Sequence, residues 1–256
     1  MNALLCDQDI RRERHGMVRA HLRGGVTFDT LRDELRQPRE TLKRSAKSWT
    51  YRLGDWVVKE SRFQKGLGVL KRTFQRRRYR RAWQAASFLA ARGVLTPEPI
   101  AYLEYGALGV IWKNAMIVRY LDGFDRVEDY AARLIKQEAN EEAVVGFLAC
   151  LGEAVRALVA TGAYHSDLAG KNILTKDGRS FYFVDLDAVR LGMRYTVERR
   201  MRNHVQLYDS FWGVVPEGPL IDFIAGMAPS GHDVGDWMRG VQEGVERRRA
   251  GGNKAD

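Results

Sequence analysis

Three polar residues in the second half of the chain, set between short apolar runs, constrain the fold most strongly. They are Asp167, Asn172 and Asp185. Asp167 and Asn172 lie in one short loop, so their side chains can point into the same site. Asp185 follows the apolar run Phe181–Val184, eighteen residues after Asp167. A hairpin between the loop and this run would bring Asp185 back beside Asn172.

The chemistry of these three side chains indicates phosphoryl transfer. That reaction needs a carboxylate that holds the acceptor hydroxyl and takes its proton, together with oxygen ligands that hold Mg²⁺ on the nucleotide phosphates. Asp167 fits the first role, and Asn172 with Asp185 fits the second. An Asp-Leu-(x)3-Asn pattern also occurs by chance. The prediction therefore depends on His165, on the spacing to Asp185 and on the flanking apolar runs.

The loop resembles a known catalytic loop. The segment from His165 to Asn172 is similar to the H-R-D-(x)4-N loop of protein kinases, with Ser166 in place of arginine. Asp185-Leu186-Asp187 is similar to their D-F-G element, with both later positions changed. More closely, the chain resembles the lipopolysaccharide core kinases, which phosphorylate Kdo or heptose sugars of the inner core. The matching stretches are Tyr51–Lys59, the basic run into Trp83, Thr96–Ala101, His165–Leu174 and Phe183–Asp187.

This resemblance implies an α+β, bilobal protein-kinase-like fold with a small β-rich N-lobe and a larger helical C-lobe. It also implies an ATP- and Mg²⁺-dependent kinase that phosphorylates an alcohol group. Asp167 would be the catalytic base, braced by His165, and Asn172 and Asp185 would bind Mg²⁺. Lys59 would pair with the α- and β-phosphates of ATP. Lys171 would reach the transferring phosphate or the acceptor, or is simply a solvated loop lysine.

Two usual features of a protein kinase are missing. The segment Lys43–Ser48, before the predicted strand at Trp49, contains no glycine, so serine hydroxyls, backbone N–H groups and lysine charge would have to hold phosphates. The strand lysine of kinases pairs with a glutamate on the next helix. Residues 62–96 contain no Asp or Glu, and Ala82 stands at the matching position. We expect another element to orient Lys59; a degraded site is the remaining alternative.

A basic stretch bears on the partner. From Lys59 to Arg81 there are ten Lys or Arg residues and one acid, Glu60, in a chain of formal net charge +10. The simplest interpretation is a solvated helix face and loop. The functional interpretation is contact with an anionic glycolipid, the lipopolysaccharide core, and peripherally with the inner membrane, where each basic group contributes about 1 kcal/mol. No nucleic acid is expected, because aromatic residues are sparse in the run, with only Phe63, Phe74 and Tyr79, and no binding motif is present.

The two cysteines, Cys6 and Cys150, give no disulfide framework, which favours a reducing compartment. No signal peptide or membrane-spanning run is predicted, so we expect a cytoplasmic protein at the inner face of the inner membrane. The predicted organisation is a helical lead-in over 1–40, an N-lobe over 41–121, a C-lobe over 122–240 and a flexible basic tail over 241–256. Expected helices cover 79–92, 127–136, 141–161, 196–213 and 218–227.

Two other functions stay open at this point. One is a protein kinase or a small-molecule kinase of the aminoglycoside type, which would need the same three polar residues. The other is a catalytically silent kinase-like binding module, which the missing glycine loop and Ala82 would suit.

Overall fold

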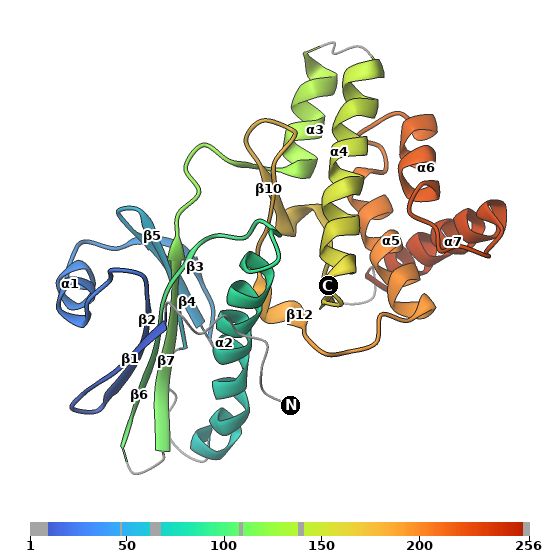
Figure 1. Ribbon diagram of the computed structural model, residues 1–256. Coiled ribbons are helices and arrows are strands. Elements are labelled where there is room, and N and C mark those ends of the chain that lie inside the picture. Colours follow the sequence, from blue (N-terminus) through green and yellow to red (C-terminus); the bar gives the residue numbers. More distant parts are fainter. Residues whose placement is uncertain (1–9, 47, 62–67, 108–109, 138–140, 253–256) are drawn as a thin grey trace. The chain divides into compact units, whose positions relative to one another are not determined.

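The computed structural model describes residues 10–46, 48–61, 68–107, 110–137 and 141–252. Figure 1 shows the chain as a ribbon. It divides into two compact units, Met1–Asp122 (unit 1) and Gly123–Asp256 (unit 2). Sheet and helices are largely segregated between these units, as in α+β folds.

Unit 1 is built on one antiparallel sheet with the strand order β1-β2-β6-β7-β5-β4-β3. Its strands are β1 (Ile10–His15), β2 (Val18–Arg23), β3 (Glu40–Arg44), β4 (Ser48–Leu53), β5 (Trp56–Ser61), β6 (Pro99–Ala107) and β7 (Val110–Arg119). β4 and β5 form an antiparallel hairpin, with Gly54 at a φ of 51° in the turn. Residues 110–119 form the single long strand β7.

Different elements pack against the two faces of this sheet. One face carries an apolar core that includes Leu22, Tyr51, Val58 and Ile117, and the helix α1 (Phe28–Glu34) adds Leu31 to it. The opposite face packs against the helix α2 (Gly68–Ala90) through β6 and β7. α2 begins well before the expected residue 79, because Lys, Arg and Gln all favour helix and let it extend into the basic stretch.

The predicted helical lead-in is wrong for residues 10–23, which form the β1–β2 hairpin at the edge of the sheet. The burial pattern of β2 alternates, because Ala20 and Leu22 are buried and their neighbours along the chain are not. This period of two residues is typical of a strand. The charged side chains of β1 conceal this period in the sequence. The helical prediction around Phe28–Leu35 is confirmed by α1, which begins after the N-cap Thr27.

Unit 2 is mainly helical. Its helices are α3 (Val127–Lys136), α4 (Glu141–Ala160), α5 (Val197–Phe211), α6 (Glu217–Ala225) and α7 (Val234–Gly252). Short strands form two small antiparallel sheets: β8 (Asp125–Arg126), β10 (Ile173–Thr175) and β11 (Phe181–Phe183) in one, β9 (Tyr164–His165) and β12 (Val189–Arg190) in the other. The four helices expected in this half of the chain are therefore present within a few residues of their predicted ends.

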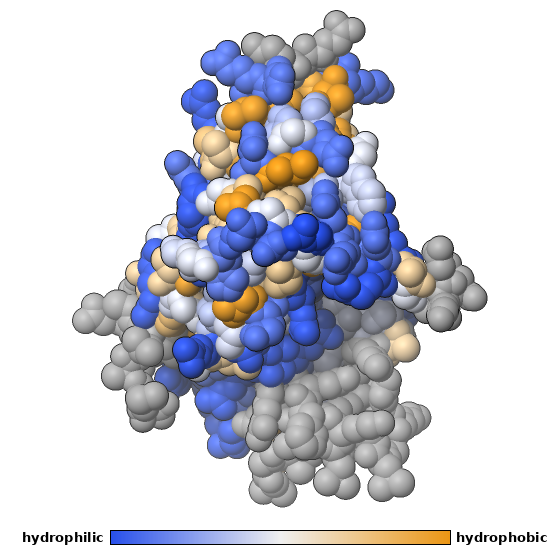
Figure 2. Space-filling view, turned by 90° about the vertical axis from the view of Figure 1, so that its right-hand side faces the viewer, coloured by the Kyte–Doolittle hydropathy of each residue, from blue (hydrophilic) through white to orange (hydrophobic). Residues whose placement is uncertain are grey.

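The helix α4 is apolar enough, at 20 residues, to pass a test for a membrane span by length and composition. The sequence expectation of no such run is therefore too strong. Phe147, Leu148, Leu151 and Val155 of α4 are buried inside unit 2, whereas Val145 is exposed. Figure 2 shows the side of the molecule that lies at the right of Figure 1, where hydrophobic side chains form small spots separated by hydrophilic ones. This burial is that of a core helix.

The predicted flexible tail over 241–256 is also wrong as far as residue 252, because α7 continues to Gly252. Val241 and Val245 are fully buried, and α7 packs along α5. Their four-residue spacing places both on one face of the helix. The basic residues Arg247, Arg248 and Arg249 follow on the last turns, and they hid this apolar stripe in the sequence.

Candidate active site

The loop from Ser166 to Asn172 is held at both ends by short strand pairs. β9 pairs with β12, and β10 pairs with β11. The backbone N–H of Val184 donates to the carbonyl oxygen of Asn172 at 2.9 Å. The predicted hairpin therefore exists, and Asp185 directly follows the residue that is bonded to Asn172.

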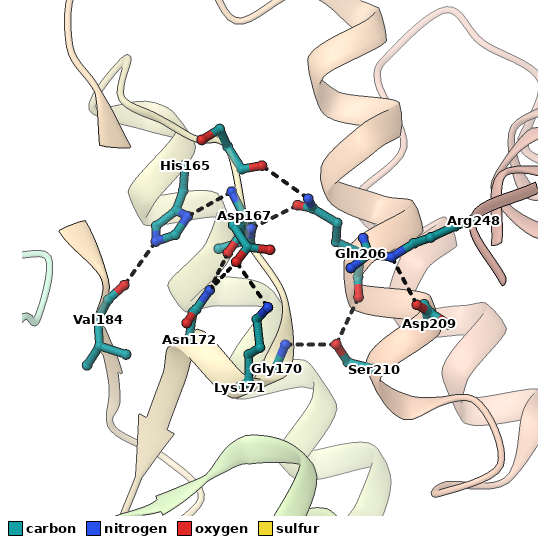
Figure 3. Close-up of polar contacts among 12 residues, drawn as sticks. His165, Asp167, Gly170, Lys171, Asn172, Val184, Gln206, Asp209, Ser210 and Arg248 are labelled. Carbon is teal, nitrogen blue, oxygen red and sulfur yellow. Dashed lines mark hydrogen bonds and ion pairs between the residues drawn. The ribbon is translucent and has the colours of Figure 1, made fainter. Parts of the chain in front are cut away.

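Asp167, Asn172 and Lys171 converge within this loop (Figure 3). The amide nitrogen of Asn172 donates to Asp167 Oδ2 at 2.9 Å and to the Asp167 carbonyl oxygen at 2.8 Å. Lys171 Nζ lies 3.2 Å from the same Oδ2. The other carboxylate oxygen of Asp167 receives none of these bonds, and the Asp167 side chain is about one third exposed, at 35%. A substrate hydroxyl can therefore reach a carboxylate that the loop has already oriented.

His165 braces the loop, as predicted. Its ring is 1% exposed and bridges two backbone groups: Nδ1 accepts from the N–H of Asp167 at 3.3 Å, and Nε2 lies 3.0 Å from the Val184 carbonyl oxygen. This pattern requires the tautomer that carries its proton on Nε2. Burial lowers the pKa of His165 below its usual value of 6.5, so the neutral ring that this bridge needs is favoured.

Asp185 has an unusual backbone conformation. Its φ of 57° and ψ of 43° lie in the left-handed region, and it is the one non-glycine residue with positive φ among those described. An L-residue there costs about 1–2 kcal/mol. Such conformations persist where the surrounding structure imposes them, and they cluster at functional sites. The turn continues into a short 3-10 helix at Leu186–Ala188.

The helix α5 holds the backbone of the loop through three polar side chains that the sequence analysis missed. Asn203 Nδ2 donates to the carbonyl oxygen of His165 at 2.8 Å. Gln206 accepts from the N–H of Leu168 at 2.8 Å and donates to the carbonyl oxygen of Ser166 at 3.1 Å. Ser210 Oγ accepts from the N–H of Gly170 at 2.8 Å. Their spacing of three and four residues puts them on one face of α5, which is the signal that could have revealed them.

Gly170 lets α3 and α5 approach the loop closely. A Cβ at this position would lie 3.1 Å from Ser210 Cβ and 3.3 Å from Glu128 Oε2. The Glu128 carboxylate, in the first turn of α3, is thus packed against the loop from Ser166 to Asn172. Partial burial, together with the nearby charges of Asp129 and Asp209, raises the pKa of Glu128.

The residues predicted as Mg²⁺ ligands fit that ion chemically. The two hydrogen bonds that the Asn172 amide makes to Asp167 use its nitrogen, so its oxygen is the group suited to a cation. Mg²⁺ is usually bound by one or two protein oxygens together with phosphates and water. Within the described residues no cluster of three or more His, Cys, Asp or Glu side chains could hold a metal without such help. An Asn172–Asp185 pair that binds Mg²⁺ together with nucleotide agrees with both observations.

Lys59 belongs to unit 1, where it lies on the sheet face that α2 covers. Val58 is in the core of the other face, and Lys59 pairs in register with Met116, which in turn pairs with Tyr102. Glu60 points the opposite way, where it binds Lys113 Nζ at 2.8 Å and the Tyr51 hydroxyl at 3.1 Å. The neighbouring acid in the sequence is therefore engaged on the other side of the sheet from Lys59.

The two departures noted in the sequence have structural counterparts. Ala82 is buried in α2, the helix that follows Lys59, so this position contributes methyl packing in place of a carboxylate. The turn between β3 and β4 is closed by Ser45 and Ser48, whose hydroxyls lie 3.0 Å apart. Lys47, which was considered as a phosphate ligand with these serines, lies outside the described residues.

The comparisons agree with this geometry. Among solved structures, the chain is similar to WaaP in complex with acyl carrier protein, with a TM-score of 0.64 and 16% identity over 85% of this chain and 90% of that one. It is also similar to a crystal structure of WbdD, with a TM-score of 0.50 and 13% identity over 82% of this chain and 46% of that one. A search of curated sequences finds no match. The predicted kinase-like α+β fold is confirmed by the first of these similarities.

The fold is that of a protein-kinase-like protein. A model of the lipopolysaccharide kinase (Kdo/WaaP) family matches residues 33–223, and the chain belongs to that family. It is accordingly a lipopolysaccharide core sugar kinase that uses ATP, as the resemblance implied. The alternatives of a protein kinase or an aminoglycoside-type kinase are set aside by this result.

Proposed function

We propose that Asp167 is the catalytic base that activates a sugar hydroxyl of the lipopolysaccharide inner core, on Kdo or heptose, for attack on the γ-phosphate of ATP. The observation that carries this proposal is the convergence of Asn172 Nδ2 and Lys171 Nζ on one oxygen of Asp167. Two donors on Oδ2 fix the carboxylate plane, and the other oxygen is left to accept the hydroxyl proton.

In the reaction, the acceptor hydroxyl oxygen forms a bond to the γ-phosphorus while the bond from that phosphorus to the β,γ-bridging oxygen breaks. The acceptor proton moves to Asp167, and ADP leaves. The Lys171 ammonium, on the other side of the Asp167 carboxylate, stabilises negative charge on the phosphoryl group as it transfers. Lys59 pairs with the α- and β-phosphates.

Asn172 and Asp185 would hold Mg²⁺, which when bound neutralises phosphate charge. The left-handed turn at Asp185 supports this role, because the residue lies directly after Val184, whose N–H is bonded to the Asn172 carbonyl oxygen. We place the reaction at the cytoplasmic face of the inner membrane, where the basic α2 and the net charge of +10 favour an anionic glycolipid surface.

Replacing Asp167 by Asn tests the proposal, since the amide keeps the size of the side chain but takes no proton. We expect transfer of labelled phosphate from ATP to delipidated inner-core oligosaccharide to fall roughly 100- to 10,000-fold. Thermal unfolding should stay close to that of the parent. Turnover at the parental rate would refute Asp167 as the base.

The parent protein provides the test against a silent binding module. ATP with Mg²⁺ at millimolar concentration should raise its melting temperature, because a ligand that binds only the folded state stabilises it. Absence of both a thermal shift and transfer would favour the binding module. Label that appears only on a protein acceptor would contradict the sugar substrate.

A further inference from the structure

Charged side chains extend from the catalytic loop across unit 2 to α7. Lys171 is paired with Asp167, and Glu128 lies against Gly170 of the same loop and within electrostatic range of both Lys171 and Asp209. Asp209 precedes Ser210, which binds the backbone of Gly170. These charged side chains therefore extend from the loop to the outer part of α5.

Two arginines of α7 form ion pairs with Asp209. Arg249 Nε lies 2.8 Å from Asp209 Oδ1, and Arg248 Nε lies 3.3 Å from Asp209 Oδ2. Figure 3 shows the Arg248–Asp209 pair next to the bond between Ser210 and Gly170. Two guanidinium groups on one carboxylate leave a net positive charge, and both side chains are more than 40% exposed. A fixed, solvent-accessible cationic pair suits a carboxylate or phosphate ligand.

An aromatic ring completes this surface. Trp212, one turn from Asp209 at the end of α5, is 43% exposed and is the one largely exposed aromatic residue among the side chains that the structure describes. The Arg249 guanidinium lies 4.1 Å from its ring centroid, so ring and cation hold each other in place. An exposed ring with an apolar face and a polar edge is able to pack on the C–H face of a sugar.

The combination of groups specifies a ligand class. Carboxylates such as Glu128 and Asp209 accept hydrogen bonds from sugar hydroxyls, the arginine pair binds anionic substituents, and Trp212 provides apolar contact. We propose that Glu128, Asp209, Trp212, Arg248 and Arg249 form the acceptor-binding surface, which holds an anionic sugar with its reacting hydroxyl at Asp167. This inference rests on the proposed sugar-kinase function and names the residues that select its substrate.

Arginine variants of α7 test it. Arg248 and Arg249 are both replaced by Ala. Arg247→Ala is the control: it removes one positive charge from the neighbouring position of α7, where the double variant removes two, and Arg247 pairs with Glu243 of its own helix. With delipidated inner-core oligosaccharide as the probe, the double variant should raise the acceptor KM at least tenfold. The KM for ATP should stay within twofold in both variants, and the control should match the parent for the acceptor as well.

Binding of the probe without ATP gives a second readout. The parent should bind the oligosaccharide, and should bind a carboxyl-reduced form of it at least tenfold more weakly; the double variant should bind both forms equally weakly. Arg248→Lys with Arg249→Lys, which retains the charges, should recover part of the affinity and checks that the surface has not simply unfolded.

The outcomes separate this inference from the function on which it rests. If the parent transfers phosphate to the oligosaccharide and the double variant has the same acceptor KM as Arg247→Ala, the acceptor surface lies elsewhere and the inference is wrong. If the parent binds the oligosaccharide in the charge-dependent way described but transfers no phosphate to it, the proposed reaction fails while the binding surface stands.

Discussion

At the scale of single residues, the site depends on a backbone conformation at Asp185 that is unfavourable for a residue other than glycine. Asp185 is held in the left-handed region directly after a strand. Its neighbours His165 and Asn172 both bind the backbone of Val184, the preceding residue. The conformation of Asp185 is thus imposed by contacts that fix the residue directly before it, which is how a strained functional position persists.

Two substitutions of Asp185 separate its carboxylate from its conformation. Asp185→Gly and Asp185→Ala both remove the carboxylate, so both should abolish phosphate transfer. Glycine adopts positive φ freely, whereas alanine does not. The glycine variant should therefore be the more stable of the two by about 1 kcal/mol in urea unfolding. Equal stabilities would show that the left-handed turn carries no strain, and transfer by either variant would remove Asp185 from the site.

At the scale of elements, α5 supports the loop from Ser166 to Asn172. Asn203 and Gln206 are buried, and with Ser210 they bind three separate segments of loop backbone. Buried backbone groups need partners, and a loop offers few of its own. A helix face with polar residues at regular spacing satisfies these groups and fixes the loop relative to a rigid element.

Gln206→Met tests this support, because methionine keeps the volume but loses the two hydrogen bonds to the loop and the one from Asn203. The N–H of Leu168 and the carbonyl oxygen of Ser166 would then lose their partner in α5, at a cost of about 2 kcal/mol in unfolding free energy. Since the position of Asp167 would also relax, kcat should fall more than tenfold with little change in the KM for ATP. Arg202→Ala, on the exposed side of the same helix, is the control. A variant with lowered stability but parental kcat would limit Gln206 to a structural role.

At the scale of the whole molecule, the sequence predicted the parts of each unit that carry strong periodicity or a fixed motif. The β4–β5 hairpin, the helices α3 to α6 and the loop with its return strand were all predictable, because apolar spacing and turn residues mark them. Residues 10–23 and α7 were not, because abundant arginine masks an alternation of two residues in β2 and a stripe of two valines in α7.

The same limit applies to the site. Asp167, Lys171 and Asn172 lie within one loop, so their meeting follows from short spacing. Asn203, Gln206 and Ser210 bind that loop from about 40 residues away, and only tertiary packing shows that their helix lies against it. What orients Lys59 likewise depends on packing in unit 1, since the acid next to it in sequence faces the other side of the sheet.

Packing of α5 against α7 also makes the free energy of unfolding decrease at acid pH. His204 of α5 is buried, and its Nδ1 accepts from Trp237 Nε1 of α7 at 2.9 Å. Burial, and to a smaller extent the charge of Arg200, lowers the pKa of His204 to about 4. The unfolded chain binds a proton near pH 6.5, whereas the folded chain does not until about pH 4. The stabilising contribution is therefore present above pH 6.5 and is lost progressively as the pH falls towards 4.

We expect the unfolding free energy to decrease by about 2 kcal/mol from this residue between pH 7 and pH 5. His165, whose pKa is lowered in the same direction, adds to the loss. His204→Asn tests the assignment, because the amide oxygen of Asn can still accept from Trp237 but does not titrate. Urea unfolding at both pH values should show a smaller decrease for the variant than for the parent, whatever its absolute stability. An unchanged pH dependence would mean that groups other than His204 govern the acid lability of the fold.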